Sequence, residues 1–264
     1  MRIGITCPVF ITNEEHRKYL NMFTNSIVSL DHDIVFIPVE NFIEPALLPQ
    51  MYYFIHEPES IHITKGKEPQ SVAAAWNIGI EKAKELGCDY VLVTNTDIVL
   101  KSNAIDRLVA FAEKANIGDT VMWTMAEYAD LGQLEESPED ENFSEHPHFS
   151  CYIVKPHFFN YVGKFDENFI PAYCEDGDMH ARLALANKKA VVYGGARFFH
   201  FGSRTIKSDH DLWNKNSVTF PKCQEYFLNK WGHPVVGDVE VMRQVYFKHP
   251  YNDESKGLDF WYEV

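Results

Sequence analysis

Several features that would assign a class of protein at once are scarce or missing in this chain. Its five cysteines lie far apart, without a Cys-x-x-Cys pair, so we expect free thiols in a reducing compartment. No apolar run approaches the ~18 residues of a membrane span, and the first residues lack the pattern of a signal peptide. We therefore expect a cytoplasmic protein without integral membrane contact.

Positive charge is also scarce. The chain has 24 Lys and Arg residues but 38 Asp and Glu residues, and its formal net charge is −14. An acidic surface repels the phosphate backbone, which argues against broad, non-specific binding of nucleic acid. The chain has neither a Gly-x-Gly-x-x-Gly loop nor a Gly-x-x-x-x-Gly-Lys loop. A phosphate site in this protein must then be built from a metal ion and side chains.

What the chain does have is an alternation of apolar strand patterns and helix patterns over 264 residues, 45% of them hydrophobic and 14% aromatic. Strands are predicted at 2–10, 33–39, 52–55 or 61–64, 90–97, 120–125, 149–155, 191–192 and 198–201. Helices are predicted from a capping box at Thr12 to about 30, at 71–86, 102–115 and 156–163, from 174 onward, and within 211–231. This order implies right-handed crossovers and a mainly parallel sheet. The eight acidic residues of the segment 127–145 indicate a solvated, mobile loop.

Asp97 ends an apolar strand, at the position where ligands of open α/β sheets collect. Asn95 stands two residues before it, and residues two apart in a strand project to the same face. Their oxygens would suit Mg²⁺ or Mn²⁺. An ordinary Asx turn after the strand explains the same two residues without a ligand, and the spacing leaves both interpretations open.

Three carboxylates, Glu175, Asp176 and Asp178, open a predicted helix. The helix dipole favours acidic residues in a first turn, so capping alone is one explanation. Asp178 and Arg182 are i,i+4 partners, which predicts a structural ion pair. Asp176 points about 100° away from Glu175, so the two cannot do the same job. A carboxylate held at a helix N-terminus stays ionised near neutral pH, as a general base must.

His200 lies between Phe199 and Phe201, and Arg204 and Lys207 follow it. A histidine among aromatic residues is commonly part of the core. As a neutral imidazole, however, it could be a further metal ligand, and the two cations could meet phosphate charge.

The order of these pieces carries more information than any one of them. The chain reads Ala73-Ala-Ala-Trp-Asn77-Ile-Gly79, then Asn95-Thr-Asp97, then GKFDENFIPAYCEDGDMHAR from Gly163 to Arg182, then Phe199-His-Phe-Gly-Ser203, and finally Lys230-Trp-Gly232. In this order the motifs resemble family 2 glycosyltransferases of the GT-A fold, and most of all their rhamnosyltransferase-like branch. The resemblance covers roughly residues 2–232.

The resemblance implies a GT-A-type, Rossmann-like, mostly parallel central sheet flanked by helices, in a single domain with a C-terminal helical extension. Residues 1–205 would form the catalytic domain, with a nucleotide-sugar half at about 1–100 and an acceptor and catalytic half at 101–205. Residues 206–264 would form the extension and tail.

The resemblance also implies a metal-dependent transfer of a sugar, with inversion, from a UDP- or dTDP-sugar to an acceptor hydroxyl. The acceptor would be a glycan or another hydroxyl-bearing molecule; modified DNA is compatible but disfavoured by the charge. Each candidate residue then has an expected role: Asp176 as base beside Glu175; Asp97 and His200 as ligands of Mn²⁺ or Mg²⁺; and Thr6, Pro8, Glu40, Asn77, Asn95 and Arg204 as donor-binding residues.

Two departures from the family pattern stand out. The family's Asp-x-Asp motif reads Asn95-Thr-Asp97, which we expect to lower the affinity for the metal. The second strand ends in Glu40-Asn41, where the family has an acidic residue and a serine that read the nucleoside. Recognition of the base by Glu40 or Asn41 is therefore a hypothesis.

Two other functions remain open from the sequence. A sugar nucleotidyltransferase would need a Gly-rich loop with Arg and Lys after the first strand, and Thr6 to Asn13 offers none. A non-catalytic sugar- or partner-binding module on the same fold has Asn95 as its best support.

Overall fold

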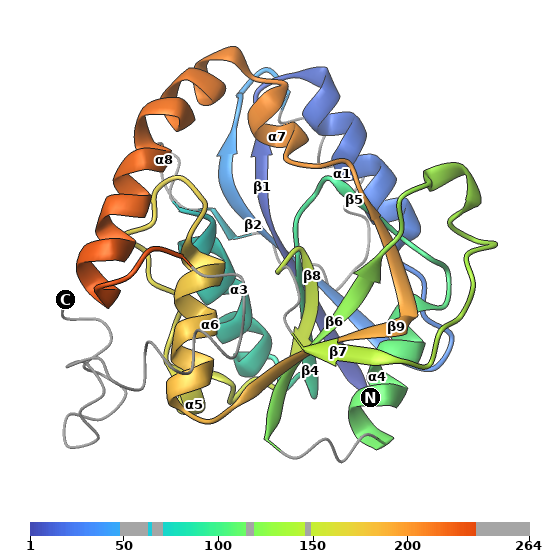
Figure 1. Ribbon diagram of the computed structural model, residues 1–264. Coiled ribbons are helices and arrows are strands. Elements are labelled where there is room, and N and C mark those ends of the chain that lie inside the picture. Colours follow the sequence, from blue (N-terminus) through green and yellow to red (C-terminus); the bar gives the residue numbers. More distant parts are fainter. Residues whose placement is uncertain (48–62, 65–70, 115–118, 146–148, 236–264) are drawn as a thin grey trace.

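The computed structural model describes residues 1–47, 63–64, 71–114, 119–145 and 149–235 (Figure 1). The alternative strand predicted at 52–55 and most of the predicted tail lie outside these residues. Within them, no helix combines the length and the apolar composition that crossing a bilayer requires. All five cysteines are buried free thiols.

The described strands form one nine-stranded sheet in the order β3-β2-β1-β4-β8-β6-β9-β5, with β7 paired to β9. Their bounds are β1 Arg2–Ile11, β2 Asp33–Ile43, β3 Ile63–Thr64, β4 Tyr90–Thr94, β5 Ile98–Leu100, β6 Thr120–Glu127, β7 Phe143–Glu145, β8 Cys151–Val154 and β9 Lys189–His200. The ladders β2-β3, β1-β2, β1-β4 and β6-β9 are parallel, and β8 is antiparallel to both of its neighbours. The predicted fold class, an α/β protein with a mostly parallel central sheet flanked by helices, is confirmed.

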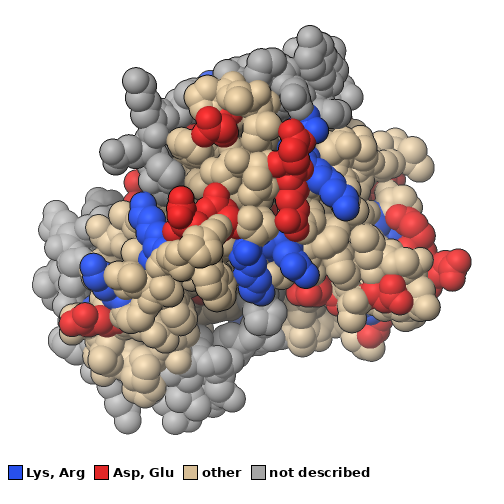
Figure 2. Space-filling view, turned by 90° about the horizontal axis from the view of Figure 1, so that it is seen from above, with Lys and Arg blue, Asp and Glu red and all other residues tan. Residues whose placement is uncertain are grey.

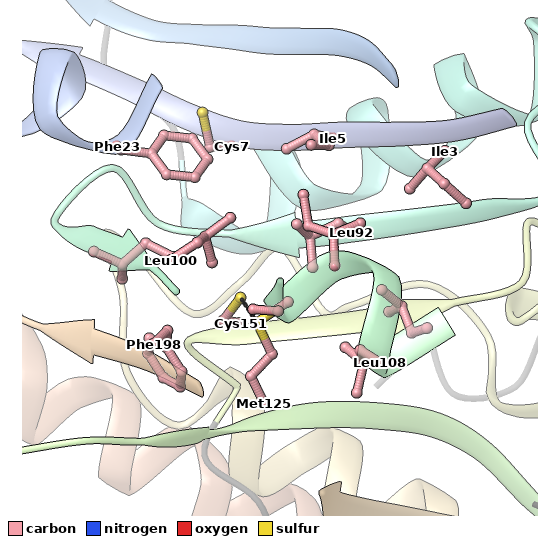
Figure 3. Close-up of a cluster of buried hydrophobic side chains, with 14 of the residues drawn as sticks. Ile3, Ile5, Cys7, Phe23, Leu92, Leu100, Leu108, Met125, Cys151 and Phe198 are labelled. Atoms are coloured by element: carbon pink, nitrogen blue, oxygen red, sulfur yellow. Dashed lines mark hydrogen bonds between the residues drawn. The ribbon is translucent and has the colours of Figure 1, made fainter. Parts of the chain in front are cut away.

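Helices cover both faces of the sheet (Figure 1). Their bounds are α1 Glu14–Ser26, α3 Val72–Glu85, α4 Ala104–Lys114, the 3₁₀ helix η1 Leu131–Gln133, α5 Phe159–Val162, α6 Glu175–Leu185, α7 Arg204–Lys207 and α8 His210–Trp231. Helices α1 and α4 pack on one face, where Phe23 and Leu108 join the strand residues Ile5 and Leu92 (Figure 3). Helices α3, α5 and α6 pack on the other. Apolar side chains on both faces of a strand explain why the strand segments read as continuous hydrophobic runs.

Helix α3 shows how closely the layers approach. Ser71 caps it as predicted, since its Oγ accepts a hydrogen bond from the N–H of Ala74 at 3.1 Å. A Cβ atom added to Gly79 would lie 1.8 Å from Thr6 Oγ1 on β1. Only glycine therefore fits at this contact, and α3 packs directly against β1.

Several predicted elements differ from the observed ones. Asn13, not Thr12, caps α1, because its side chain accepts the His16 N–H at 3.0 Å. The two short strands predicted at 191–192 and 198–201 are parts of β9, a single strand that passes through Gly194 and Gly195. At both glycines an added Cβ atom would meet neighbouring atoms within 3 Å. The glycine pair therefore marks a close contact inside one strand and not the end of a strand.

The acidic segment 127–145 is not simply a solvated loop. It contains η1 and the edge strand β7, and it is tied to α4 and to the turn before that helix. Arg107 bonds Glu139 at 2.7 Å and also pairs with Glu141, while Lys101 Nζ donates to the carbonyl of Ser137 at 2.8 Å. Composition alone indicated a loop because the basic partners come from another part of the chain.

Helix α8 is joined to α6 by a buried group of charges. Lys230 Nζ lies 2.6 Å from Asp166 and 2.8 Å from Asp178, and Trp231 Nε1 donates to Asp178 at 2.9 Å. Asp178 also pairs with Arg182 at 2.6 Å, which confirms the predicted ion pair. Burial acts to raise the pKa of Asp178, but the charges of Arg182 and Lys230 hold it below the ordinary value.

The predicted boundary between a catalytic domain and an extension at residue 205 stays a prediction.

Replacing Lys230 by Met should destabilise the protein strongly, because Asp166 and Asp178 would remain buried without their shared cation. Loss of one partner of a buried charge pair typically costs about 3–5 kcal/mol of unfolding free energy. Urea denaturation measures this, with Lys222→Met, an exposed position of the same helix, as the matched control. A loss below about 1 kcal/mol, the range of a surface ion pair, would contradict the structural role of Lys230.

Candidate functional site

A cavity of about 370 Å³ opens where the central strands end. Its walls come from the ends of β1, β2, β6 and β9, from the turn after β4, from the loop before α6, and from the N-terminal parts of α3, α6, α7 and α8. The lining residues are Pro8, Phe10, Asn41, Val72, Trp76, Asn95, Thr96, Asp97, Glu127, Phe149, Ser150, Pro171, Ala172, Tyr173, Glu175, Asp176, His200, Ser203, Thr205, Ile206 and Leu212. Carboxyl ends of parallel strands are the expected place for a ligand in such a sheet.

Asp97 and His200, the two predicted metal ligands, lie side by side in this cavity. Strand β5 pairs antiparallel with β9 and sets Ile98 opposite His200, which places the residue before Ile98 beside the histidine. The imidazole Nε2 lies 3.3 Å from Asp97 Oδ1, and Asp97 Oδ2 accepts the backbone N–H of Arg204 at 2.9 Å. Burial lowers the pKa of His200, but the contact with Asp97 and the negative charges of Asp97 and Glu127 together raise it by more, so that the pKa lies above its ordinary value.

The donor atoms of this pair fit a divalent cation. His200 Nε2 is buried and has no hydrogen-bond partner among the described residues, although Asp97 Oδ1 is only 3.3 Å away. A carboxylate oxygen and an imidazole nitrogen this close can share one ion. Within the described residues, no group of three or more His, Cys, Asp or Glu side chains forms a complete metal cluster. A cation here would therefore take its other ligands from a bound phosphate, as Mg²⁺ commonly does.

Glu175, the first residue of α6, is buried in the cavity wall with 7% of its surface exposed. Burial, reinforced by the charge of Asp176, raises the pKa of Glu175 to about 8. Its Oε2 atom has no hydrogen-bond partner among the described residues. The helix dipole alone would favour the ionised form, but desolvation outweighs it, and Glu175 carries a proton at neutral pH.

Asp176 also lines the cavity but is only half-buried. Its Oδ1 atom accepts the N–H of Gly177 at 2.7 Å, which leaves Oδ2 for a ligand. The backbone that presents the two acidic residues is strained, because Tyr173 and Cys174 have φ angles of 79° and 73°. Left-handed backbone at non-glycine residues costs roughly 1–3 kcal/mol each and is concentrated at functional sites.

The predicted donor-binding residues divide into two groups. Pro8 and Asn95 line the cavity, and so does Asn41 in place of its neighbour Glu40. The register of β1 and β2 slips at this point: Val9 pairs with Glu40 and Phe10 with Phe42, so Asn41 is the extra residue of a bulge. A bulge re-aims a side chain, which the sequence pattern does not reveal.

Thr6, Asn77 and Arg204 do not line the cavity. Thr6 is fully buried beneath it and donates its hydroxyl to the carbonyl of Ile37 at 2.9 Å. The Asn77 side chain bonds the backbone N–H and C=O of Phe165, each at 2.8 Å, and so holds the loop that leads to α6. Arg204 touches the site through its backbone N–H to Asp97, while its side chain is exposed.

Sequence reasoning missed Trp76, Glu127 and Tyr173. Trp76 Nε1 is a third buried polar atom of the cavity wall without a partner among the described residues. Glu127, at the end of β6, has Oε2 4.0 Å from His200 Nδ1. Trp76 lies in the recognised Ala-x-x-Trp-Asn segment, one residue before Asn77, and Tyr173 precedes the acidic pair by two residues. Only Glu127 could not have been identified as a site residue from the sequence, because it is one of eight acidic residues in the segment 127–145.

Stability should fall as the pH rises through the range where Glu175 titrates. The folded protein keeps this proton up to about pH 8, whereas the unfolded chain loses it near 4.5, so the folded state binds more protons between these values. We expect Glu175→Gln to flatten the decline in melting temperature between about pH 5 and about pH 8, with Glu225→Gln, an exposed site, as control. An unchanged slope would show that Glu175 ionises normally.

Known proteins resemble this chain in structure but not in sequence. No protein-family model and no curated protein matches it. Residues 1–349 of S. aureus TarS in complex with UDP-GlcNAc align with a TM-score of 0.61 at 11% identity, over 97% of this chain and 74% of the other. The same TarS fragment without that ligand aligns at 0.60 and 11%, over 93% and 69%. GalNAc-T7 with UDP, GalNAc and Mn²⁺ aligns at 0.53 and 13%, over 94% and 55%.

These likenesses show the fold. The chain has the GT-A architecture of glycosyltransferases, as the sequence motifs implied. At 11–13% identity a likeness of this kind shows the fold alone.

Proposed function

We propose that this protein is an inverting, metal-dependent glycosyltransferase that moves a sugar from a UDP- or dTDP-sugar to an acceptor hydroxyl. The observation that carries the proposal is the convergence of two chemically different pairs, Asp97 with His200 and Glu175 with Asp176, on one cavity of a GT-A fold. Structural neighbours bound to UDP, or to UDP-GlcNAc, support the choice of donor. Assignment to the rhamnosyltransferase-like branch rests on the sequence motifs from Gly163 to Ser203.

In the proposed reaction Asp176 removes the proton of the acceptor hydroxyl. The acceptor oxygen then forms a bond to the anomeric carbon while the bond from that carbon to the diphosphate oxygen breaks. The electron pair of the broken bond leaves on the nucleoside diphosphate, and the sugar passes through an oxocarbenium-like transition state. Attack on the face opposite the leaving group inverts the anomeric configuration.

Asp97 and His200 would hold a Mn²⁺ or Mg²⁺ ion, whose chemistry is to neutralise the charge on the departing diphosphate. Asn95 lies beside them in the cavity; the aspartate of the family motif would add ligand charge at this position. The exposed side chain of Arg204, which does not line the cavity, would contribute a second positive contact from outside it. Glu175, protonated at neutral pH, cannot compete with Asp176 for the base role. As a neutral carboxyl group it can donate a hydrogen bond to the substrate.

The nucleoside would occupy the part of the cavity between the ends of β1 and β2, lined by Pro8, Phe10 and Asn41. Thr6 and Asn77 would support the site without touching the donor. Thr6 fixes β1 against β2, and Asn77 fixes the loop before α6.

With Mn²⁺ present, UDP or dTDP should raise the melting temperature, and ADP should not. A ligand that binds only the folded state adds about 2.7 kcal/mol of stability at a hundredfold excess over its Kd, which a thermal-shift assay resolves easily. A larger shift with ADP or GDP would contradict the pyrimidine assignment and leave the transferase proposal standing.

Asn95 favours one competing function, a sugar-binding module that has lost catalysis. The two are separated by incubating the protein with UDP-sugars and Mn²⁺ and measuring release of UDP. A transferase hydrolyses its donor slowly when water replaces the acceptor, whereas a binding module releases no nucleoside diphosphate.

A further inference from the structure

Beside the cavity, helix α8 carries two large aromatic side chains on its surface. They lie on the side of the helix whose later residues are buried in the protein. Trp213 and Phe220 are seven residues apart, which places them on the same side of the helix. That stripe continues into Cys223 and Phe227, which are buried. Trp213 and Phe220 are nevertheless 47% and 37% exposed. An apolar stripe that is covered at one end and exposed at the other marks a surface with room for a partner.

This exposed surface is continuous with the cavity. The rings of Phe220 and Tyr173 are in edge-to-face contact, with centroids 5.4 Å apart and planes at 73°. Tyr173 itself lines the cavity together with Asp176, and Leu212, the neighbour of Trp213, lines it as well. The aromatic surface therefore begins beside the carboxylate that would act as base. A molecule lying on Tyr173, Phe220 and Trp213 would present its end to Asp176.

The extent and the charge of the surface limit what can bind there. Seven helical residues rise by about 10 Å, so the surface from Phe220 to Trp213 is longer than one sugar ring. The cavity beside it contains the carboxylates of Asp97, Glu127 and Asp176, together with the neutral carboxyl group of Glu175. Viewed from above, the described Lys and Arg side chains on this side lie in small groups among acidic ones, without a continuous basic stripe (Figure 2). A polyanionic acceptor would meet repulsion here, and a neutral one would not.

We propose that Tyr173, Phe220 and Trp213 form an acceptor subsite for a neutral glycan of at least two pyranose rings. The C–H faces of pyranose rings are apolar and pack against aromatic rings, while their hydroxyl groups stay in water or turn toward the polar cavity. This inference rests on the proposed function, because it assigns the acceptor of the same site.

The test uses saturation-transfer NMR on the full chain in the presence of UDP and the diamagnetic ion Mg²⁺. Its probes are the neutral disaccharides methyl β-lactoside and methyl β-maltoside. At least one of them should receive saturation at its ring C–H protons. Trp213→Ala and Phe220→Ala should each weaken its binding by about three- to tenfold, the effect of losing one aromatic contact. Val218→Ala, an exposed apolar position of the same helix, is the matched control and should change nothing. Phe220→Tyr keeps an aromatic ring and should bind the disaccharide as the unmodified protein does. This variant therefore distinguishes the loss of an aromatic contact from a disturbance of the helix.

The outcomes separate this inference from the proposed function. Absence of saturation from every disaccharide, in a protein whose binding of UDP is shown by calorimetry, overturns the glycan subsite alone. Equal weakening by Trp213→Ala and Val218→Ala also overturns it. Saturation of a single-stranded oligonucleotide that depends on Trp213 would replace the glycan by a nucleic acid. A dimer that Trp213→Ala dissociates, measured by sedimentation, would assign the surface to a second copy of the chain.

Discussion

Asp176→Asn should abolish transfer while leaving the affinity for the donor nearly intact. Removal of a general base typically lowers the rate by about 10²–10⁴-fold or more, and an amide cannot accept the acceptor's proton. The fold should survive, since Asn is nearly as good as Asp at a helix N-terminus, and its Oδ1 can keep the hydrogen bond from the Gly177 N–H. Calorimetric titration with the donor and a turnover assay measure the two effects separately.

The neighbouring residue supplies the control for this experiment. Glu175 carries a proton at neutral pH because burial raises its pKa to about 8. Glu175→Gln resembles that neutral form and should keep far more activity than Asp176→Asn. Turnover like that of the unmodified protein in Asp176→Asn, together with a large loss in Glu175→Gln, would transfer the base role to Glu175.

The second large effect concerns the cation. Chelation should suppress activity and added Mn²⁺ should restore it. Asp97→Ala should weaken the binding of Mn²⁺ by more than the roughly 10–100-fold that loss of an outer-shell partner causes. The donor should bind less tightly in parallel, because the ion would join protein and diphosphate. Electron paramagnetic resonance of free Mn²⁺ reports this binding without relying on activity.

Asp97 has a structural contact too, and the design must account for it. Its Oδ2 accepts the N–H of Arg204, so alanine removes a loop contact together with a ligand. Asp97→Asn keeps one oxygen for that N–H but loses the charge, and it should bind Mn²⁺ almost as poorly as Asp97→Ala. Full activity of the unmodified protein in chelator would show that Arg204 and Lys207 replace the ion and that Asn95 marks a real loss of metal dependence.

The sequence by itself determined the class of fold and the order of the main elements. Apolar runs such as the one beginning at Tyr90 predicted strands buried on both faces, because strands of this kind need apolar side chains on both sides. Ser71 predicted the start of α3 since a cap is a local interaction. The spacing of Asp178 and Arg182 predicted their ion pair for the same reason. The motif order also predicted that Asp97, Glu175, Asp176 and His200 belong to one site.

Only the tertiary structure decided the surroundings of those residues. The protonation of Glu175 follows from burial among residues distant in sequence, and its position at a helix start indicated the opposite. Asn41 rather than Glu40 reaches the cavity because of a bulge in the pairing of β1 with β2. Asn77 turns out to support a loop, and Glu127 joins the site only because β6 ends beside β9. Each of these outcomes depends on contacts between separate segments of the chain, and local patterns in a single sequence do not specify such contacts.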